Sequence, residues 1–247
     1  MSRFLLLPIA MCFCCAASGA ELVVSAAASL GNAFAELKPA FEAAHPGASL
    51  SLNLGASGAL LQQIAKGAPA DVFASADQES MDTAQRRGLL AAGKRVNFAS
   101  NSLVLIVPVG GKCQPANLEQ LLQTACGRIA IGVPGSVPAG RYAMAALESA
   151  GLRSAIERRM IAAQNVRQAL DYVARGEVDA GFVYGTDAAL LRDRVRVAFT
   201  VPTPQRILYP AAPIAGSAQA ALAQAFVDYL VSPGAQAVLA KYGFGKP

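Results

Sequence analysis

Hydrophobic residues near the start of the chain follow first a strand pattern and then a helix pattern. Residues 22–27 form a short apolar run of the kind that fills a buried strand. Ser29 follows this run at a position typical of a helix N-cap, and Pro39 is expected to bend the helix. The apolar positions of that helix recur with a spacing of about 3.6 residues: Leu30, Ala33, Phe34, Leu37 and Phe41.

The same order of strand and helix recurs along the chain and predicts parallel sheets with right-handed crossovers. In the first half, strands are expected at 50–54 and 71–74, and helices at 60–66 and 81–89. In the second half, strands are expected at 128–133 and 180–184, and helices at 138–151 and 166–175. Asn165 is the expected cap of this last helix and Gly176 its stop. Two more helices, 218–230 and 233–242, are expected at the end of the chain.

Three further apolar stretches are suited to join two sheets. The stretch 101–108 is long enough to pass from one domain into another, and 195–201 and 207–214 can bring the chain back. The predicted fold class is therefore α/β, with two similar α/β lobes of mixed sheets joined by two crossover strands. The first lobe comprises 21–101 and 206–247, and the second comprises 102–205. Ligands of open α/β sheets bind outside the carboxyl ends of the strands, which here predicts a cleft between the lobes.

Four short segments each read as a strand that runs into the start of a helix: 26–30, 55–58, 137–140 and 165–167. A fifth, 181–185, reads as a strand that ends at Tyr184. Helix N-termini expose unpaired N–H groups and the positive end of the helix dipole. Several such termini directed at one point would bind an anion without lysine or arginine. The pattern favours a protein that captures a small oxyanion over an enzyme.

The first twenty residues have the three parts of a secretory signal peptide. Arg3 gives a basic start, an apolar run follows, and small residues precede Glu21. We expect cleavage after about Ala20 and a soluble, exported protein. A lipoprotein is disfavoured because no small residue precedes Cys12, Cys14 or Cys15 in the way that lipidation requires.

Two cysteines remain after cleavage, Cys113 and Cys126. In an oxidising compartment such a pair is expected to form a disulfide. Closing this loop of about 14 residues would contribute about 3 kcal/mol on the chain-entropy account.

The formal net charge of the chain is +5. The basic residues form only small groups, such as Arg158-Arg159, without interleaved aromatic residues, so nucleic-acid binding is not expected. These charges are expected to lie on solvated faces.

Enzymatic alternatives find little support in the sequence. Ser29 and Ser57 could serve only as helix caps, although their matched positions at strand ends favour a ligand-binding role. Residues 55–59 nearly match the G-x-S-x-G motif of serine hydrolases, but Ala59 replaces the second glycine. His45 is the only histidine and lies in a His-Pro-Gly turn, which makes it a poor catalytic base and disfavours a zinc site.

Over nearly the whole mature length, the sequence resembles the periplasmic molybdate-binding proteins of ABC importers. The matching stretches are 26–30, 67–77, 101–104, 137–143, 183–188 and 241–244. The resemblance implies a type II periplasmic-binding fold that holds molybdate or tungstate between its lobes and delivers it to a membrane permease. It also implies a monomer in the periplasm with no cofactor, in which molybdenum is present only as the oxyanion. A sulfate or broader oxyanion receptor is the alternative on this scaffold, and a secreted serine hydrolase is a more remote one.

Carried over position by position, the resemblance implies five ligand-binding residues. Hydroxyl and N–H donors would come from Ser29 and Ser57, main-chain N–H groups from Ala139 and Val166, and a hydroxyl from Tyr184. A fully deprotonated oxyanion only accepts hydrogen bonds, so no Asp or Glu is expected in contact with it. The sequence departs from the family pattern at two sites, because Gly31 stands where many relatives have threonine and Gly58 where some have serine.

Overall fold

The computed structural model describes residues 19–123 and 125–247 and contains two five-stranded sheets. The first sheet has the order β2-β1-β3-β10-β4, and the second has the order β7-β6-β8-β5-β9. In each sheet the first three strands are parallel and the last two are joined by antiparallel pairing. The two sheets therefore share one plan, and the predicted fold class is confirmed.

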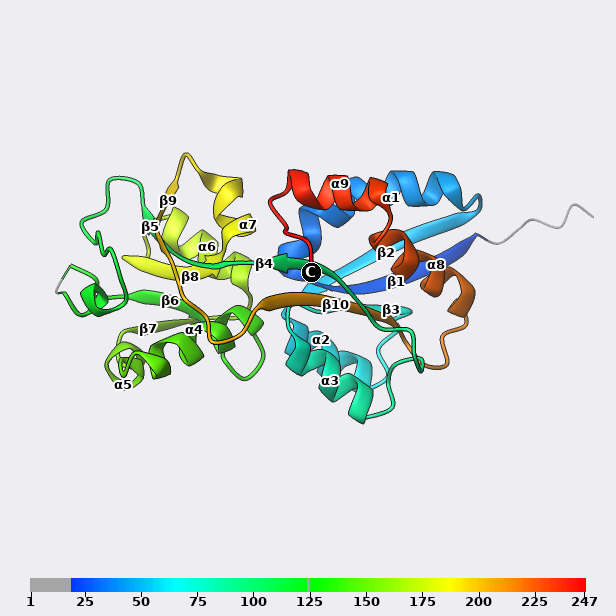
Figure 1. The fold of residues 1–247 in the computed structure, drawn as a ribbon, viewed down its shortest axis with the longest axis horizontal. Helices are drawn as coiled ribbons and strands as arrows, with labels where there is room; N and C mark the ends of the chain where they lie inside the picture. Colours follow the sequence, from blue (N-terminus) through cyan, green and yellow to red (C-terminus); the bar gives the residue numbers. More distant parts are fainter. Residues whose placement is uncertain (1–18, 124) are drawn as a thin grey trace, which may run out of the picture.

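We call the half of the molecule around the first sheet lobe I and the half around the second sheet lobe II (Figure 1). The strands of lobe I are β1 (Ala20–Ala27), β2 (Ala48–Gly55), β3 (Val72–Ala74), β4 (Val96–Asn101) and β10 (Ile207–Pro213). Its helices are η1 (Ala28–Leu30), α1 (Gly31–Ala44), α2 (Ser57–Ala65), α3 (Gln78–Arg86), α8 (Ala220–Leu230) and α9 (Pro233–Lys241). Helices α2 and α3 cover one face of the sheet, and α1, α8 and α9 cover the other (Figure 1).

Lobe II repeats this arrangement. Its strands are β5 (Leu103–Pro108), β6 (Ile129–Gly132), β7 (Met160–Ala163), β8 (Ala180–Tyr184) and β9 (Val195–Thr200). Its helices are η2 (Glu119–Leu122), α4 (Pro138–Ser149), α5 (Arg153–Glu157), α6 (Val166–Ala174), α7 (Gly185–Ala188) and η3 (Ala189–Leu191). Helices α4 and α5 lie on one side of the sheet, and α6 and α7 on the other (Figure 1).

Two connections cross between the lobes. The chain passes from β4 to β5 at Ser102 and returns through residues 201–206 between β9 and β10 (Figure 1). The strand predicted over 101–108 is confirmed over 103–108 as β5, but it begins later than predicted, because the chain breaks at Ser102 and Asn101 belongs to β4 of the other sheet. Ser102 is held at the break by its N–H, which donates to Asn101 Oδ1 at 2.9 Å.

Most helix boundaries agree with the sequence. The side chain of Asn165 caps α6 by accepting from Gln168 N–H, and Gly176 ends that helix at a φ of 69°. The helix predicted over 81–89 begins earlier, at Gln78, because Asp77 caps it by accepting from Ser80 N–H.

The prediction that Ser29 caps the first helix is wrong. Neither η1 nor α1 has a side-chain cap, and Ser29 Oγ instead lies 3.0 Å from the hydroxyl of Tyr209. Ser57 likewise makes no cap, since it is the first residue of α2 and Ala56 occupies the N-cap position.

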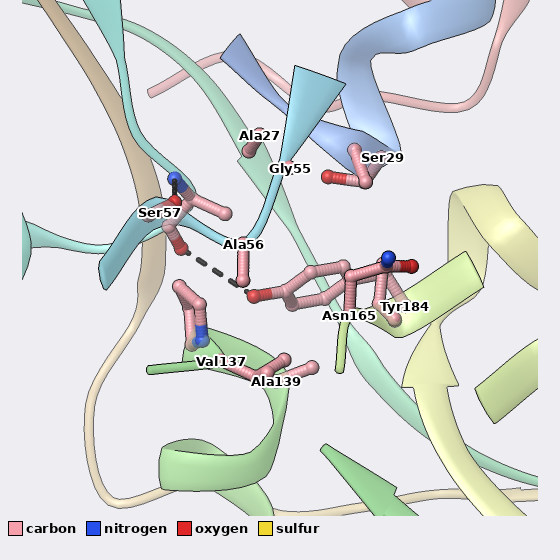
Figure 2. A pocket seen from close by; sticks show the side chains of 13 residues that line it. Ala27, Ser29, Gly55, Ala56, Ser57, Val137, Ala139, Asn165 and Tyr184 are labelled. Carbon is pink, nitrogen blue, oxygen red and sulfur yellow. Dashed lines mark hydrogen bonds between the residues drawn. The ribbon is translucent and has the colours of Figure 1, made fainter. Parts of the chain in front are cut away.

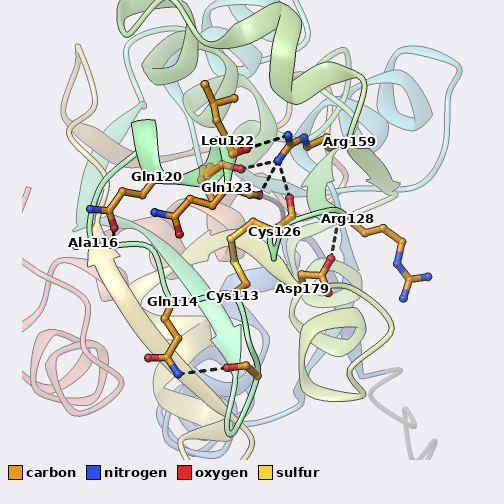
Figure 3. The surroundings of a disulfide bond; sticks show 12 residues. Cys113, Gln114, Ala116, Gln120, Leu122, Gln123, Cys126, Arg128, Arg159 and Asp179 are labelled. Atoms are coloured by element: carbon orange, nitrogen blue, oxygen red, sulfur yellow. Dashed lines mark hydrogen bonds between the residues drawn. A yellow bond between two sulfur atoms is a disulfide. The ribbon is translucent and has the colours of Figure 1, made fainter.

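A disulfide joins Cys113 to Cys126 in lobe II (Figure 3). The guanidinium of Arg159 holds the same loop at distances of 2.8 to 3.1 Å, by donating to the main-chain oxygens of Leu121, Leu122, Gln123 and Cys126 (Figure 3). The expectation that Arg159 lies on a solvated face holds only in part, because the residue is half-buried and its side chain serves as a structural donor.

Within the described residues, no helix is both long and apolar enough to cross a membrane. The predicted signal peptide falls almost entirely on residues 1–18, which lie outside the described residues.

Candidate functional site

A small cavity lies between the two lobes, where strand ends meet helix starts. The empty space within it is about 210 Å³, which includes open solvent at its mouth. Its lining comes from both lobes and carries no charged side chain among the described residues: Ala27, Ala28, Ser29, Gly55, Ala56, Ser57, Ala76, Val137, Pro138, Ala139, Asn165, Val166 and Tyr184 (Figure 2). The cavity therefore suits a small ligand that binds through neutral groups.

All five residues predicted to bind the ligand line this cavity. Ser29 and Ser57 come from lobe I, and Ala139, Val166 and Tyr184 come from lobe II. All five are buried. The structure thus brings together residues that lie as far as 155 positions apart in the sequence (from 29 to 184).

Lobe II presents two helix starts to the cavity. Ala139 and Val166 lie in the first turns of α4 and α6, where N–H groups have no acceptor within the helix. Pro138 at the first position of α4 has no N–H, and Asn165 caps the third N–H of α6. Ala139 and Val166, whose N–H groups are left over, line the cavity in the positive field of the helix dipoles.

Ser57 is held by a main-chain donor from the neighbouring segment of lobe I. The N–H of Ala76 donates to Ser57 Oγ at 3.0 Å (Figure 2). Because this bond occupies a lone pair of the oxygen, the hydroxyl proton of Ser57 remains available for a ligand. Sequence reasoning did not assign Ala76 a role, although it lies in the matching stretch 67–77.

Tyr184 reaches into the cavity from the end of β8, and its hydroxyl points toward the Ser57 segment (Figure 2). The hydroxyl lies 3.5 Å from the carbonyl oxygen of Ala76, at the limit of hydrogen bonding, so a closer acceptor would attract it. Burial raises the pKa of Tyr184 well above its ordinary value. The group therefore stays protonated and acts as a donor.

Tyr209 lies behind Ser29 and does not line the cavity. Its ring is fully buried and packs edge-on against Tyr184, with ring centroids 5.8 Å apart. Its hydroxyl contacts Ser29 Oγ and also accepts from Asn101 Nδ2 at 3.2 Å. Sequence reasoning treated Tyr209 only as part of a strand, because nothing local to it indicates a partner 180 residues away.

Two arginines in the first turns of the lobe II helices bridge the cleft. Arg141 of α4 pairs with the buried carboxylate of Asp77 in lobe I, and its Nε lies 2.9 Å from Asp77 Oδ2. It also donates to Ser80 Oγ of lobe I at 2.9 Å and to Pro134 O of its own lobe at 3.1 Å. These contacts join α4 to the start of α3 across the interface.

Arg167 of α6 makes the second bridge. It pairs with Asp187 in its own lobe and donates across the cleft to Asn32 Oδ1 at 2.7 Å and to Ser29 O at 3.1 Å. Burial raises the pKa of Asp187 to about 6, although the charge of Arg167 opposes this shift. Each arginine is therefore partnered by a carboxylate, and the cavity itself keeps its neutral lining.

Gly58 allows the two main chains to come close together. Its N–H donates to Ser136 O in lobe II at 2.9 Å, and a Cβ at this position would lie 2.8 Å from both Cα and O of Ser136. The glycine that departs from the family pattern thus fits this closed arrangement. Gly31, the other departure, lies beside Leu54, whose Cδ1 would be 2.9 Å from an added Cβ.

His45 lies away from the cavity, at the end of α1. Its Nδ1 is 2.9 Å from Phe41 O, and its ring packs on that of Phe41. His45 therefore does not serve as the base that a serine hydrolase would need at Ser57. Among the described residues, the structure also has no cluster of three or more His, Cys, Asp or Glu side chains that could hold a metal ion.

Comparison with known proteins agrees with this architecture. The profile of the bacterial extracellular solute-binding proteins matches residues 22–245. The chain belongs to this family. The molybdate-binding protein ModA of Escherichia coli (strain K12) is 35% identical to it over 230 residues, which cover 91% of this chain and 88% of that protein.

Solved structures of solute-binding proteins have the same fold. The periplasmic molybdate-binding protein of Azotobacter vinelandii superposes with a TM-score of 0.78 at 26% identity, covering 92% of this chain and 99% of that one. The sulfate-binding protein SubI from Mycobacterium tuberculosis H37Rv superposes with a TM-score of 0.77 at 21% identity, covering 91% and 86%. This second likeness shows the fold alone.

Proposed function

We propose that this protein is the substrate-binding component of an ABC importer and that it captures molybdate between its lobes. The observation that carries the proposal is the small, buried cavity with a neutral lining of hydroxyl groups and helix N-termini. The identity of 35% to a molybdate-binding protein supports this choice of oxyanion. We extend the proposal to tungstate, a tetrahedral dianion of similar chemistry.

The proposed ligand contacts are the hydroxyls of Ser29, Ser57 and Tyr184 and the N–H groups of Ala139 and Val166. A fully deprotonated oxyanion can only accept, and each of these groups can donate. The charges of Arg141 and Arg167 are paired with carboxylates, so the helix dipoles and these donors would stabilise the anion.

The proposal includes the cellular setting of such a receptor. The protein would be a periplasmic monomer, formed by cleavage after about Ala20, with lobe boundaries at 21–101 with 206–247 and at 102–205. A membrane permease would receive the oxyanion when the lobes open about the two connections at Ser102 and 201–206.

Calorimetric titration of the dialysed protein with molybdate, tungstate and sulfate tests the proposal. We expect one-to-one binding of the first two and much weaker binding of sulfate. Ser29→Ala and Tyr184→Phe should each weaken molybdate binding by about 1–3 kcal/mol, because each removes one buried donor. Folded, ligand-free protein that gives no heat with any of the three anions would contradict the proposal.

Sulfate is the second candidate ligand. A sulfate-binding protein has the same fold as this chain, so the scaffold is compatible with sulfate as well as with molybdate. Equal affinity for sulfate and molybdate in the titration would favour this broader receptor.

A further inference from the structure

A serine hydroxyl can either donate or accept a hydrogen bond, so a site for a deprotonated anion must fix the direction of each hydroxyl. For Ser57 the main chain does this, because Ala76 N–H can only donate to Ser57 Oγ. Among residues 19–123 and 125–247, no main-chain N–H donates to Ser29 Oγ, which instead contacts the hydroxyl of Tyr209 at 3.0 Å, where either oxygen could be the donor. The direction of this bond is set by the Asn101 amide, which also contacts the Tyr209 hydroxyl.

The orientation of the Asn101 amide is set by the main chain. Ser102 N–H lies 2.9 Å from one end of the amide, and since an N–H can only donate, that end is the oxygen Oδ1. The other end is therefore Nδ2, which donates to Thr186 Oγ1 at 2.9 Å and to the Tyr209 hydroxyl at 3.2 Å.

The Asn101 amide in turn determines where the hydroxyl proton of Tyr209 points. The hydroxyl oxygen accepts from Asn101 Nδ2, so its single proton is free for its other neighbour, Ser29 Oγ. Tyr209 is fully buried, and burial raises its pKa well above the ordinary value, which keeps this proton in place. Ser29 Oγ then accepts from Tyr209, and the proton of Ser29 points away from Tyr209 toward the cavity that Ser29 lines.

We propose that Asn101 and Tyr209 form a hydrogen-bond relay that commits the Ser29 hydroxyl to donate to the ligand, and so selects oxyanions without a proton of their own. This inference rests on the proposed function. Both are positioning residues, since neither lines the cavity. A monohydrogen oxyanion such as hydrogen phosphate carries an O–H that needs an acceptor, and the relay turns the Ser29 proton, which is a donor, toward it.

A double-mutant cycle separates this relay from a purely structural role of Tyr209. Calorimetry with molybdate would compare the wild type, Tyr209→Phe, Ser29→Ala and the double variant. We expect Tyr209→Phe to weaken binding roughly tenfold in the wild-type background, the loss of about one hydrogen bond. In the Ser29→Ala background the same change should alter affinity by less than about twofold, because the relay acts only through Ser29. An equal loss in both backgrounds would overturn the relay.

The preference among anions gives a second readout. Without the Tyr209 hydroxyl, Ser29 Oγ is free to accept, so the ratio of hydrogen phosphate affinity to molybdate affinity should rise in Tyr209→Phe. Tyr229→Phe, which removes a hydroxyl from α8 outside the cavity, is the matched control and should leave the ratio unchanged. An unchanged ratio in Tyr209→Phe would also overturn the relay.

Asn101→Asp provides an independent test if Tyr209→Phe does not fold. A carboxylate in place of Nδ2 would draw the Tyr209 proton away from Ser29 and reverse the relay. The added charge weakens molybdate binding both in the wild type and in Ser29→Ala. The part of the loss of affinity that is absent in the Ser29→Ala background therefore measures the relay. If the wild type binds none of the oxyanions, the proposed function fails; if it binds and the cycles are additive, only the relay fails.

Discussion

The two lobes share one sheet topology but present different kinds of donor to the cavity. Lobe II supplies N–H groups at the starts of α4 and α6, whose direction is fixed by the main chain, and one side-chain hydroxyl, that of Tyr184. Lobe I supplies the serine hydroxyls, whose direction depends on partners behind them, Ala76 N–H for Ser57 and Tyr209 for Ser29. The comparison teaches that the direction of the donors in an oxyanion site can be fixed mainly by the backbone in one lobe and by contacts between side chains and their neighbours in the other.

Val166→Pro breaks the lobe II side of the comparison and should have the largest effect. Val166 is the first residue of α6, a position that accommodates proline, and Asn165 before it is extended, with φ −158° and ψ 173°. The substitution therefore removes the N–H donor without disrupting the helix. We expect molybdate binding to weaken by about 1–3 kcal/mol in calorimetry. Val166→Ala keeps the N–H and is the matched control; equal losses in both variants would show that the donor is irrelevant.

Asp187→Asn tests the buried ion pair between Asp187 and Arg167 of α6. Burial raises the pKa of the folded-state carboxyl from 3.8 to about 6, so the folded protein holds this proton at a pH where the unfolded chain has lost it. Stability from this group is therefore complete below about pH 4 and is lost as pH rises through 6.

The wild type should lose up to about 3 kcal/mol of unfolding free energy relative to Asp187→Asn between pH 4 and pH 7. Urea unfolding of both proteins across this range measures the difference. A difference that grows in favour of the wild type as pH rises would mean that Arg167 dominates and that the pKa is lowered instead.

Gly58→Ala tests how closely the lobes must approach. The added Cβ would lie 2.8 Å from Ser136 Cα and O in the other lobe, so closure around a ligand should be hindered. We expect roughly tenfold weaker molybdate binding, about the loss of one hydrogen bond, and a larger radius of gyration in X-ray scattering with ligand present. Gly234→Ala, at the corresponding second position of α9 where a Cβ has open space, is the control. Wild-type affinity in Gly58→Ala would show that the lobes close without this contact.

Asn32→Ala should have the smallest effect. It removes the acceptor that Arg167 contacts across the cleft at 2.7 Å, and it leaves the Arg167–Asp187 pair intact. Because Asn32 is exposed, we expect only a twofold to fivefold faster dissociation of molybdate, on the order of 0.5–1 kcal/mol. Stopped-flow measurement should find the association rate unchanged; a dissociation rate equal to that of the wild type would assign the bridge no role in holding the lobes closed.

Local patterns in the sequence predicted most helices and strands, although β4 and β7 were missed. The five ligand-binding residues were implied by the resemblance to molybdate-binding proteins, and neither source revealed the contacts behind those residues. The cap at Asn165 and the stop at Gly176 depend on neighbours within a few positions, so they could be predicted. The capping role predicted for Ser29 was wrong because its actual partner, Tyr209, is 180 residues away.

The arginine bridges were missed for the same reason. Arg141 and Asp77 are 64 positions apart, and Arg167 contacts Asn32 across 135 positions. Neither pair has a local signal such as the spacing of charges along a helix. Only the packing of the two lobes brings these groups together.

A crystal structure of the molybdate complex, with the molybdenum located by its anomalous scattering, tests the central claim most directly. The account predicts one molybdenum peak in the cavity between the lobes, with oxygens in contact with the hydroxyls of Ser29, Ser57 and Tyr184 and the N–H groups of Ala139 and Val166. A peak outside this cavity, or a lysine or arginine side chain in direct contact with the anion, would contradict it.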